Sequence, residues 1–335
     1  MKILVVGGTQ FVGRHIVNAL LDEGDEVTLF HRGQTNPELF PDVEHRRGDR
    51  NSDLSALAQG RWDATIDPSA YIPRQVRALA DVLGSRGGRY VHISSVSAYG
   101  HLASPGANED APLAVPEDPT NEVVNDVTYG GLKSLCEAAT HEAFGPGGHG
   151  WSGEAPSIVR PTYVAGPFDH TGRFTWWVRR IAKGGPVLAP GPRENPFQVI
   201  DVRDVADFVT RLANGSSSGV FHLAGPRPPF MFENFLSAVV DQVGSPDCQL
   251  TWIEAWRLLD AGVTGAEFPL WAALDDDRFV SALDPSRAID AGLRIRPLDE
   301  TIRDVRDHEL LAPTTIRGAV GISATREREL LAALS

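Results

Sequence analysis

The sequence is poor in cysteine, with only Cys136 and Cys248 among its 335 residues. The two are far apart and not in C-x-x-C spacing, so neither a disulfide framework nor a zinc site is expected. His170 has no Cys, His or carboxylate at metal-ligand spacing, and we predict no metal. We expect both thiols to be buried by packing.

The sequence also lacks positive charge and long apolar runs. Lys and Arg number 31 against 44 Asp and Glu, a net charge of −13, which argues against a nucleic-acid partner and an anionic membrane surface. The first apolar run, Ile3 to Val6, leads directly into glycines and is too short for a secretory or membrane-spanning segment. We therefore predict a soluble, cytoplasmic protein.

Glycine, in contrast, is abundant, with 33 residues, and its positions are informative. Ile3 to Val6 fits a buried parallel strand, and the apolar residues from Val12 onward have helical spacing. A glycine-rich loop between them favours a bound dinucleotide, because free N–H groups and the helix dipole point at its pyrophosphate. The predicted cofactor-binding residues in this loop are Gly7, Thr9, Gln10, Phe11, Val12 and Gly13. Alternatively, the glycines only make a tight turn.

A second strand ends at His31 and Arg32, where the ribose of the adenosine half is expected. No carboxylate stands there to repel a 2′-phosphate, and an arginine can bind that phosphate with a charge-assisted fork. NADP(H) is therefore favoured over NAD(H). The alternative for Arg32 is a solvated loop charge. Asp49, followed by Arg50, is placed to reach the adenine edge, although Gly-Asp is also simply a turn.

A third apolar strand leads into Ser94 and Ser95, at the strand end where ligands bind in open α/β sheets. Further along, Tyr129 and Lys133 are four residues apart, which places them on one face of a helix. A nearby ammonium favours the phenolate, so this tyrosine is suited to exchange protons near neutral pH, and Lys133 can also bond the nicotinamide ribose. A serine hydroxyl opposite would hold the substrate oxygen beside the hydride-bearing carbon.

With these motifs, the chain resembles the short-chain dehydrogenase/reductase superfamily, in its extended branch of nucleotide-sugar-epimerase-like proteins. The resemblance runs from Met1 to about Gly225 and more loosely to the C-terminus. It rests on Gly7-Gly8-Thr9-Gln10-Phe11-Val12-Gly13, His92-Ile93-Ser94-Ser95-Val96-Ser97-Ala98-Tyr99-Gly100, Tyr129-Gly130-Gly131-Leu132-Lys133, Val159-Arg160-Pro161 with Gly166-Pro167, and Ile200-Asp201-Val202-Arg203-Asp204-Val205-Ala206.

The resemblance implies roles for individual residues. Ser95 carries the catalytic hydroxyl, Tyr129 is the catalytic acid/base, and Lys133 is its electrostatic partner and a cofactor ligand. Further cofactor contacts are implied in the segment from Asp67 to Tyr71, where we select Ser69 and Ala70, and at Arg160, which runs past the nicotinamide. Ser94 and Tyr71 are expected to touch substrate.

Two departures from the family pattern matter. Gln10 replaces the middle glycine, as in a subgroup with a Gly-Gly-Thr-x-Phe loop, and narrows the approach to the pyrophosphate. Phe197 stands where sugar-nucleotide enzymes of the family often carry an arginine that clamps the substrate diphosphate. This loss argues against a UDP- or dTDP-sugar substrate, although Arg193 is near enough to substitute.

The predicted fold class is α/β, a Rossmann-type doubly wound parallel sheet with a smaller, mainly C-terminal α/β substrate domain. We expect the dinucleotide-binding domain at 1–165, with a returning segment at about 197–225, and the substrate-binding domain at 166–196 and 226–335. His170, Arg173 and Trp176 are candidates for a half-polar substrate pocket. Trp176 and Trp177 can equally begin a helix that packs into the small domain.

Three functions are compatible with these features. The first is an NAD(P)-dependent reductase or dehydrogenase acting on a small polar sugar-, nucleoside- or natural-product-like substrate. The second is an epimerase that retains its cofactor and works through a transient ketone, with a dehydratase ranked lower because Val96, not a carboxylate, follows Ser95. The third is a redox-silent nucleotide-gated or RNA-associated binding protein. The sequence leaves a homodimer open.

Overall fold

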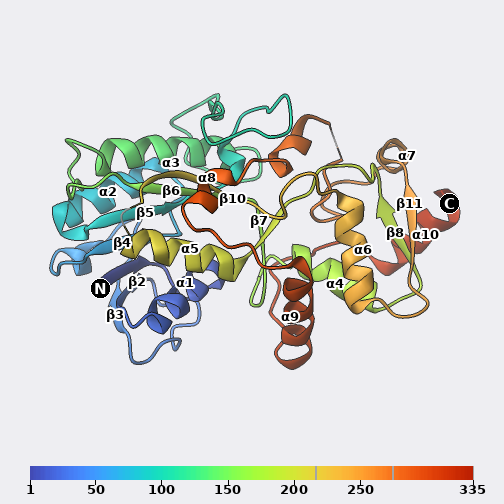
Figure 1. Cartoon of the computed structure of the whole chain (residues 1–335), viewed down its shortest axis with the longest axis horizontal. Helices are drawn as coiled ribbons and strands as arrows, with labels where there is room; N and C mark the ends of the chain where they lie inside the picture. Colours follow the sequence, from blue (N-terminus) through green and yellow to red (C-terminus); the bar gives the residue numbers. More distant parts are fainter. Residues whose placement is uncertain (216, 274, 335) are drawn as a thin grey trace.

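The computed structural model describes residues 1–215, 217–273 and 275–334. Figure 1 shows two lobes, with the N-terminus at the edge of the lobe that contains the large sheet and the C-terminus at the far end of the other lobe. Within the described ranges, no helix is long and apolar enough to cross a membrane. Cys136 is fully buried as expected, whereas Cys248 is only partly buried.

The large sheet has seven strands, and every neighbouring pair is parallel. The order β10-β6-β5-β4-β1-β2-β3 reverses between β1 and β4, which creates a crevice at the carboxyl ends of these two strands. The strands are β1 (Lys2–Val6), β2 (Glu26–His31), β3 (Glu44–Arg47), β4 (Ala64–Asp67), β5 (Arg89–Ile93), β6 (Ser157–Pro161) and β10 (Gly219–Leu223). The predicted Rossmann-type α/β fold is confirmed.

Helices cover both faces of this sheet (Figure 1). One face carries α1 (Phe11–Asp22) and α5 (Val202–Asn214), and the other carries α2 (Pro73–Leu83) and α3 (Tyr129–Phe144). Because successive side chains of a strand point to opposite faces, Ile3 packs on the α1 and α5 side and Leu4 on the α2 and α3 side. This is why β1 is apolar without alternation.

Short elements complete the connections of the sheet lobe. They are the 3-10 helices η1 (Ser55–Leu57), η2 (Gly84–Gly87) and η3 (Val96–Ala98), and the short helix α8 (Ser286–Asp290), which packs near β10. Of these, η3 matters most for the site, because it begins directly after Ser95 at the carboxyl end of β5.

The second lobe has its own hydrophobic core, which includes Trp177, Phe197 and Phe235. Its elements are β7 (Tyr163–Ala165), α4 (Arg173–Ala182), β8 (Pro186–Pro190), β9 (Val199–Asp201), α6 (Phe232–Val243), β11 (Gln249–Ile253), α7 (Ala255–Asp260), α9 (Leu298–Leu311) and α10 (Ala324–Leu334). The 3-10 helix η4 (Asp275–Ser281) instead packs through Phe279 and Val280 against Val96 and Tyr99, which follow β5. Strands β8 and β11 pair in parallel, as do β7 and β9. The exact domain boundaries stay a prediction.

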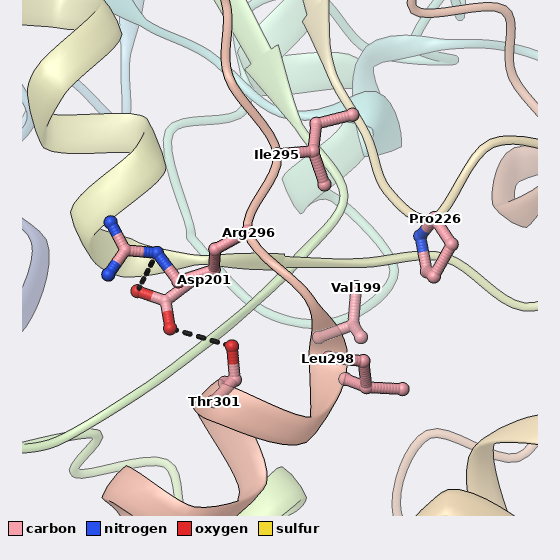
Figure 2. Close-up of a pocket in the computed structure, with 7 residues that line it drawn as sticks. All are labelled: Val199, Asp201, Pro226, Ile295, Arg296, Leu298 and Thr301. Atoms are coloured by element: carbon pink, nitrogen blue, oxygen red, sulfur yellow. Dashed lines mark hydrogen bonds and ion pairs between the residues drawn. The ribbon is translucent and has the colours of Figure 1, made fainter.

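A junction of polar side chains joins α9 to the start of α5 (Figure 2). Asp201 caps α5 by accepting a hydrogen bond from the backbone N–H of Arg203 at 2.8 Å. The same carboxylate accepts a bond from Thr301 Oγ1 at 2.7 Å and lies 3.8 Å from Arg296 Nε. The C-terminal part of the chain is thereby attached to the sheet lobe.

A buried ion pair closes the carboxyl end of β4. Arg50 Nη1 donates to Asp67 Oδ1 at 2.7 Å and Arg50 Nη2 to Oδ2 at 2.8 Å, while Tyr90 OH donates to Oδ2 at 2.9 Å. Burial opposes ionisation of Asp67, but the charge and hydrogen bonds of Arg50 outweigh it and hold the pKa of this carboxyl below its usual range. The pair fixes the loop after β3 beside the crevice.

Replacing this carboxylate should destabilise the protein strongly. Asp67→Asn leaves the buried Arg50 without a counter-charge, so the free energy of unfolding should fall by about 3 kcal/mol in urea titrations at pH 7. The exposed Asp81→Asn is the control and should change it by less than about 1 kcal/mol.

The stability contributed by the Asp67 carboxylate should also depend on pH, in a direction set by its lowered pKa. A depressed folded pKa stabilises the protein above the unfolded carboxyl pKa of about 3.9, and this stabilisation is lost as the pH falls below it. The difference between wild type and Asp67→Asn should therefore shrink below about pH 4. A difference that is constant from pH 7 to pH 3 would contradict the assignment.

Candidate functional site

A cleft of about 430 Å³ lies at the carboxyl ends of β1, β2 and β4, where the strand order reverses. The glycine loop forms one wall. Gly8 has a φ of +95°, and a Cβ there would lie 2.7 Å from Leu29; a Cβ on Gly13 would lie 2.8 Å from the backbone nitrogen of Gly8. The loop and the first turn of α1 can pack this closely only without side chains at these positions, and this geometry fits a dinucleotide cradle.

Most of the predicted cofactor residues line this one cleft. Those that do are Gly7, Thr9, Gln10, Phe11, Val12, Gly13, His31, Arg32, Asp49, Arg50 and Ser69. Tyr71 and His170, predicted as substrate contacts, line it as well. Ala70, Lys133 and Arg160 are not among the lining residues.

The end of β2 is basic. His31 Nε2 lies 2.9 Å from His45 Nδ1, and Arg47 Nη1 lies 2.9 Å from His31 Nδ1. Burial, followed by the charges of Arg47 and His45, lowers the pKa of His31 to about 4, so this ring is neutral at pH 7. Arg32 is exposed, lines the cleft, and forms no ion pair with any described residue.

The predicted adenine-side residues are held by bonds within the protein. The Asp49 carboxylate accepts from the backbone N–H of Asn51 at 2.9 Å, and the Arg50 guanidinium is paired with Asp67. Ser69 Oγ lies 2.7 Å from Arg50 Nη1 and donates to the carbonyl of Val6 at 2.8 Å. These residues shape the cleft wall, and Arg50 acts there chiefly by positioning β4.

The predicted catalytic hydroxyls come together. Ser95, at the end of β5, and Tyr129, at the start of α3, lie close enough for the Ser95 hydroxyl to lower the pKa of the Tyr129 phenol, while Ser95 Oγ itself donates to Ser97 Oγ at 3.2 Å. A Cβ on Gly130 would collide with the carbonyl oxygen of Ser97, so this glycine lets α3 approach η3 closely. The Tyr71 ring, 6.4 Å from that of Tyr129 between centroids, borders the same space.

The electrostatics of Tyr129 differ from the sequence-based expectation. Burial raises the pKa of Tyr129, and the influences that lower it are the Ser95 hydrogen bond and the charge of Arg173, with no resolved contribution from Lys133. The Lys133 ammonium donates instead to the carbonyls of Ala70 at 2.9 Å and Ile93 at 2.7 Å. The helical spacing is as predicted, but the Lys133 ammonium bonds the carbonyls that follow β4 and end β5, because buried carbonyls require hydrogen-bond donors.

Ser94 and Arg160 belong to a buried network beneath the hydroxyl pair. Arg160 Nη2 donates to Glu137 Oε2 at 2.6 Å, and Ser94 Oγ donates to Glu137 Oε1 at 2.5 Å. Arg160 Nη1 also donates to the Tyr99 hydroxyl at 2.5 Å, which in turn lies 2.5 Å from His222 Nε2. The polar groups of Ser94 and Arg160 are therefore bonded to Glu137 in this structure, and their contacts with substrate and cofactor stay predictions.

The remaining predicted substrate residues are spread over a wider region. The guanidinium of Arg173 lies 5.2 Å from the centre of the Tyr163 ring. Its charge also lowers the pKa of Tyr129. Trp176 lies within α4 and packs at right angles to Trp177, which matches the helix alternative. Arg193 stacks 5.0 Å from the Trp252 ring of β11 and is not part of the cleft lining.

Two residues of the site were missed by the sequence analysis. Glu137 lies one helical turn after Lys133, and an acidic residue in a helix carries no signal of burial by itself. Arg317 lies between α9 and α10, yet it lines the cleft beside Gln10. No local pattern marks Arg317, because the residues that it meets in the cleft belong to distant parts of the sequence.

The Rossmann-type fold, with Ser95 and Tyr129 at the carboxyl edge of its sheet and Lys133 buried, is that of an extended short-chain dehydrogenase/reductase, a class of enzyme that uses a nicotinamide dinucleotide. The chain belongs to the NAD dependent epimerase/dehydratase family, whose model matches residues 3–225. The Gly-Gly-Thr-x-Phe subgroup stays a prediction.

One curated relative is a protein of Arabidopsis thaliana described as chloroplast stem-loop binding protein of 41 kDa b. It is 26% identical over 270 residues, which cover 74% of this chain and 65% of that protein. The chain thus matches slightly less than two thirds of the relative's length.

Solved structures show the same fold at low sequence identity. WbmG of Bordetella bronchiseptica in complex with NAD and UDP has a TM-score of 0.68 at 16% identity, covering 96% of this chain and 99% of that one. UDP-glucose 4-epimerase of Thermus thermophilus in complex with NAD has a TM-score of 0.63 at 20% identity, covering 93% and 100%. At these identities, the likeness establishes the architecture and not the substrate.

The buried pair of Glu137 and Arg160 should be essential for stability. Glu137→Ala leaves a buried guanidinium without its counter-charge and should lower the free energy of unfolding by about 3 kcal/mol in urea titrations. Glu142→Ala on the same helix removes an exposed pair with Arg77 and should cost less than about 1 kcal/mol. Equal losses in the two variants would contradict the assigned role of Glu137.

Proposed function

We propose that this protein is an NADP(H)-dependent oxidoreductase that interconverts a ketone and a secondary alcohol. The observation that carries the proposal is the approach of the Ser95 hydroxyl, after β5, to the Tyr129 phenol at the start of α3, with Lys133 buried one turn further along this helix. The cofactor, when bound, supplies or accepts the hydride. The chain supplies the proton, the orientation of the substrate and the binding surface.

Tyr129 is suited to hold the proton that the substrate oxygen takes up. Because burial raises its pKa, the phenol is protonated at neutral pH and is ready to donate when an oxyanion develops beside it. Ser95 Oγ, which lies near enough to this phenol to lower its pKa, is placed to orient the same substrate oxygen. The charge of Arg173 lowers the pKa of this phenol and eases its ionisation.

The NADP(H) preference rests on the end of β2. Arg32 lines the cleft without an acidic partner among the described residues, and the adjacent His31 ring is neutral at pH 7. A 2′-phosphate would meet a guanidinium there and no repelling charge. This arrangement supports a phosphorylated ribose over the unmodified one.

For the substrate, we propose a small polar sugar-, nucleoside- or natural-product-like molecule. Phe197 is fully buried in the core of the second lobe, and Arg193 is stacked on Trp252. Neither is presented as a clamp for a substrate diphosphate, which disfavours a nucleotide sugar. An epimerase with retained cofactor remains the alternative, since the same hydroxyl pair serves its first half-reaction.

A second candidate function is favoured by the curated relative, which is named as a stem-loop binding protein. In that case this chain would be an RNA-associated or nucleotide-gated binding protein without redox turnover. The net charge of −13 opposes it, because nucleic-acid binding draws its affinity from phosphate contacts with cations. Salt-dependent affinity for an RNA hairpin, together with absent turnover, would favour this candidate.

Three further properties are proposals carried by the sequence: a cytoplasmic location, the division into a dinucleotide-binding and a substrate-binding domain, and a homodimer as one assembly to be tested.

Removing the Tyr129 hydroxyl should abolish most of the activity. With NADPH and a panel of small polar ketones, turnover is followed by the absorbance of the reduced nicotinamide. Tyr129→Phe should lower kcat about 100-fold or more because the proton donor is lost, while the Kd for NADPH stays unchanged. Undiminished turnover in Tyr129→Phe would refute the proposal, and cofactor retained through purification without net turnover would favour the epimerase.

Arg32→Ala should weaken NADPH binding selectively. Loss of a charge-assisted contact to the 2′-phosphate should raise the Kd for NADPH about tenfold and leave that for NADH nearly unchanged, as measured by fluorescence titration. Arg61→Ala removes an exposed arginine outside the cleft and serves as the control. An equal change for both nucleotides would remove the basis for the NADP(H) preference.

A further inference from the structure

The segment between α9 and α10, residues 312–323, brings Arg317 to the nucleotide cleft and is called here the C-terminal strap. Its Arg317 backbone N–H donates to the carbonyl of His170 at 3.0 Å. The Arg317 Nη2 lies 3.5 Å from Gln10 Oε1, at the outer limit of a hydrogen bond. Both Arg317 and His170 line the cleft together with the glycine loop.

Packing on each side of Arg317 holds the strap at this place. Ile316 fills the space over Gly172, where a Cβ would lie 2.6 Å from its Cδ1, and Trp176 fills the space over Gly321. Ile322 is buried in the core of the second lobe. Arg317 therefore sits between two fixed points, and its position is set by the fold even though its side chain is exposed.

The charges around the glycine loop identify what Arg317 can bind. Residues 7–13 contain no cationic side chain. Arg14, the next residue, has its guanidinium 3.5 Å from the centre of the Phe168 ring, and burial lowers its pKa. Arg317 has no acidic partner among the residues that the structure describes. It is thus a cation facing a loop that is built for an anion.

The start of α1 is open on the same side. Gln10 is the N-cap residue of α1, but its side chain makes no capping bond, so the first amides of the helix have no side-chain acceptor from it. Its Oε1 points instead toward Arg317. The residue that departs from the family's glycine pattern is the one that meets the strap.

We propose that Arg317 binds the diphosphate of the dinucleotide from the side opposite to the glycine loop, and that Gln10 positions it. The inference rests on the proposed function, because it requires a dinucleotide in the cleft. The proposal gives the Gln10 side chain a role. Its amide narrows the approach to the diphosphate, but it also holds the Arg317 guanidinium, whose positive charge offsets that loss. Arg317 is then a cofactor ligand supplied by the far end of the chain.

The test compares two nucleotides that differ in the diphosphate. NADPH contains both the 2′-phosphate and the diphosphate, whereas adenosine 2′-monophosphate has only the former. Arg317→Ala should raise the Kd for NADPH about tenfold in fluorescence titrations, the loss expected for a charge-assisted contact. The Kd for adenosine 2′-monophosphate, measured by calorimetry, should be unchanged. Arg32→Ala should weaken both.

The control is Arg328→Ala, which removes an exposed arginine of α10 that bonds within its own helix and should leave both Kd values unchanged. Thermal unfolding of Arg317→Ala should match wild type, which separates a lost contact from a lost fold. Wild type that binds neither nucleotide would overturn the proposed function itself. Wild-type binding of NADPH with no loss in Arg317→Ala, or an equal loss for both nucleotides, would overturn the assignment of Arg317 alone.

The role of Gln10 is tested by a double-mutant cycle on the Kd for NADPH. If Gln10 acts through Arg317, Gln10→Ala weakens binding in wild type and has no further effect in Arg317→Ala. Additive losses would show that Gln10 acts independently of Arg317 and would overturn its positioning role.

Discussion

The buried pair of Arg160 and Glu137 is the constraint on which the rest of the site depends. Arg160 belongs to β6 and Glu137 to α3, so the pair fixes this helix against the carboxyl edge of the sheet. Neither charge can leave its partner without an uncompensated charge in the interior. Because Ser94 also bonds Glu137, the end of β5 is held in the same arrangement, and Ser95 is thereby kept opposite Tyr129.

The cleft depends on a second constraint, the reversal of strand order between β1 and β4. The connections that follow β1 and β4 run to opposite faces of the sheet, and this leaves room for a ligand at the carboxyl ends of these strands. The pair of Asp67 and Arg50 stabilises one wall of this space, and the close contact of Gly8 with Gly13 shapes the other. Residues from the second lobe then complete it, since His170 and Arg317 reach the glycine loop from there.

Predictions from short motifs were the accurate ones. The strand from Ile3 to Val6, the glycine loop and the helix that begins at Tyr129 each follow from neighbouring residues, because burial on both faces, missing side chains and helical periodicity are local properties. Individual side chains were harder to assign. Arg160 is bound by Glu137, Lys133 by two backbone carbonyls and Arg193 by an aromatic ring, partners that sequence spacing does not reveal.

The sequence by itself determined the Rossmann-type fold and the place of the glycine loop, because each depends on a run of adjacent residues. The roles of Ser95 and Tyr129 stay predictions that rest on the family resemblance. The tertiary structure alone decided which charges meet. It set the direction of the Tyr129 pKa, since burial outweighs the influence of the Ser95 hydroxyl and the charge of Arg173, and it brought Arg317 to Gln10. Electrostatic interactions are strong only between groups a few ångströms apart. The fold, and not the order of residues in the sequence, determines which groups lie that close.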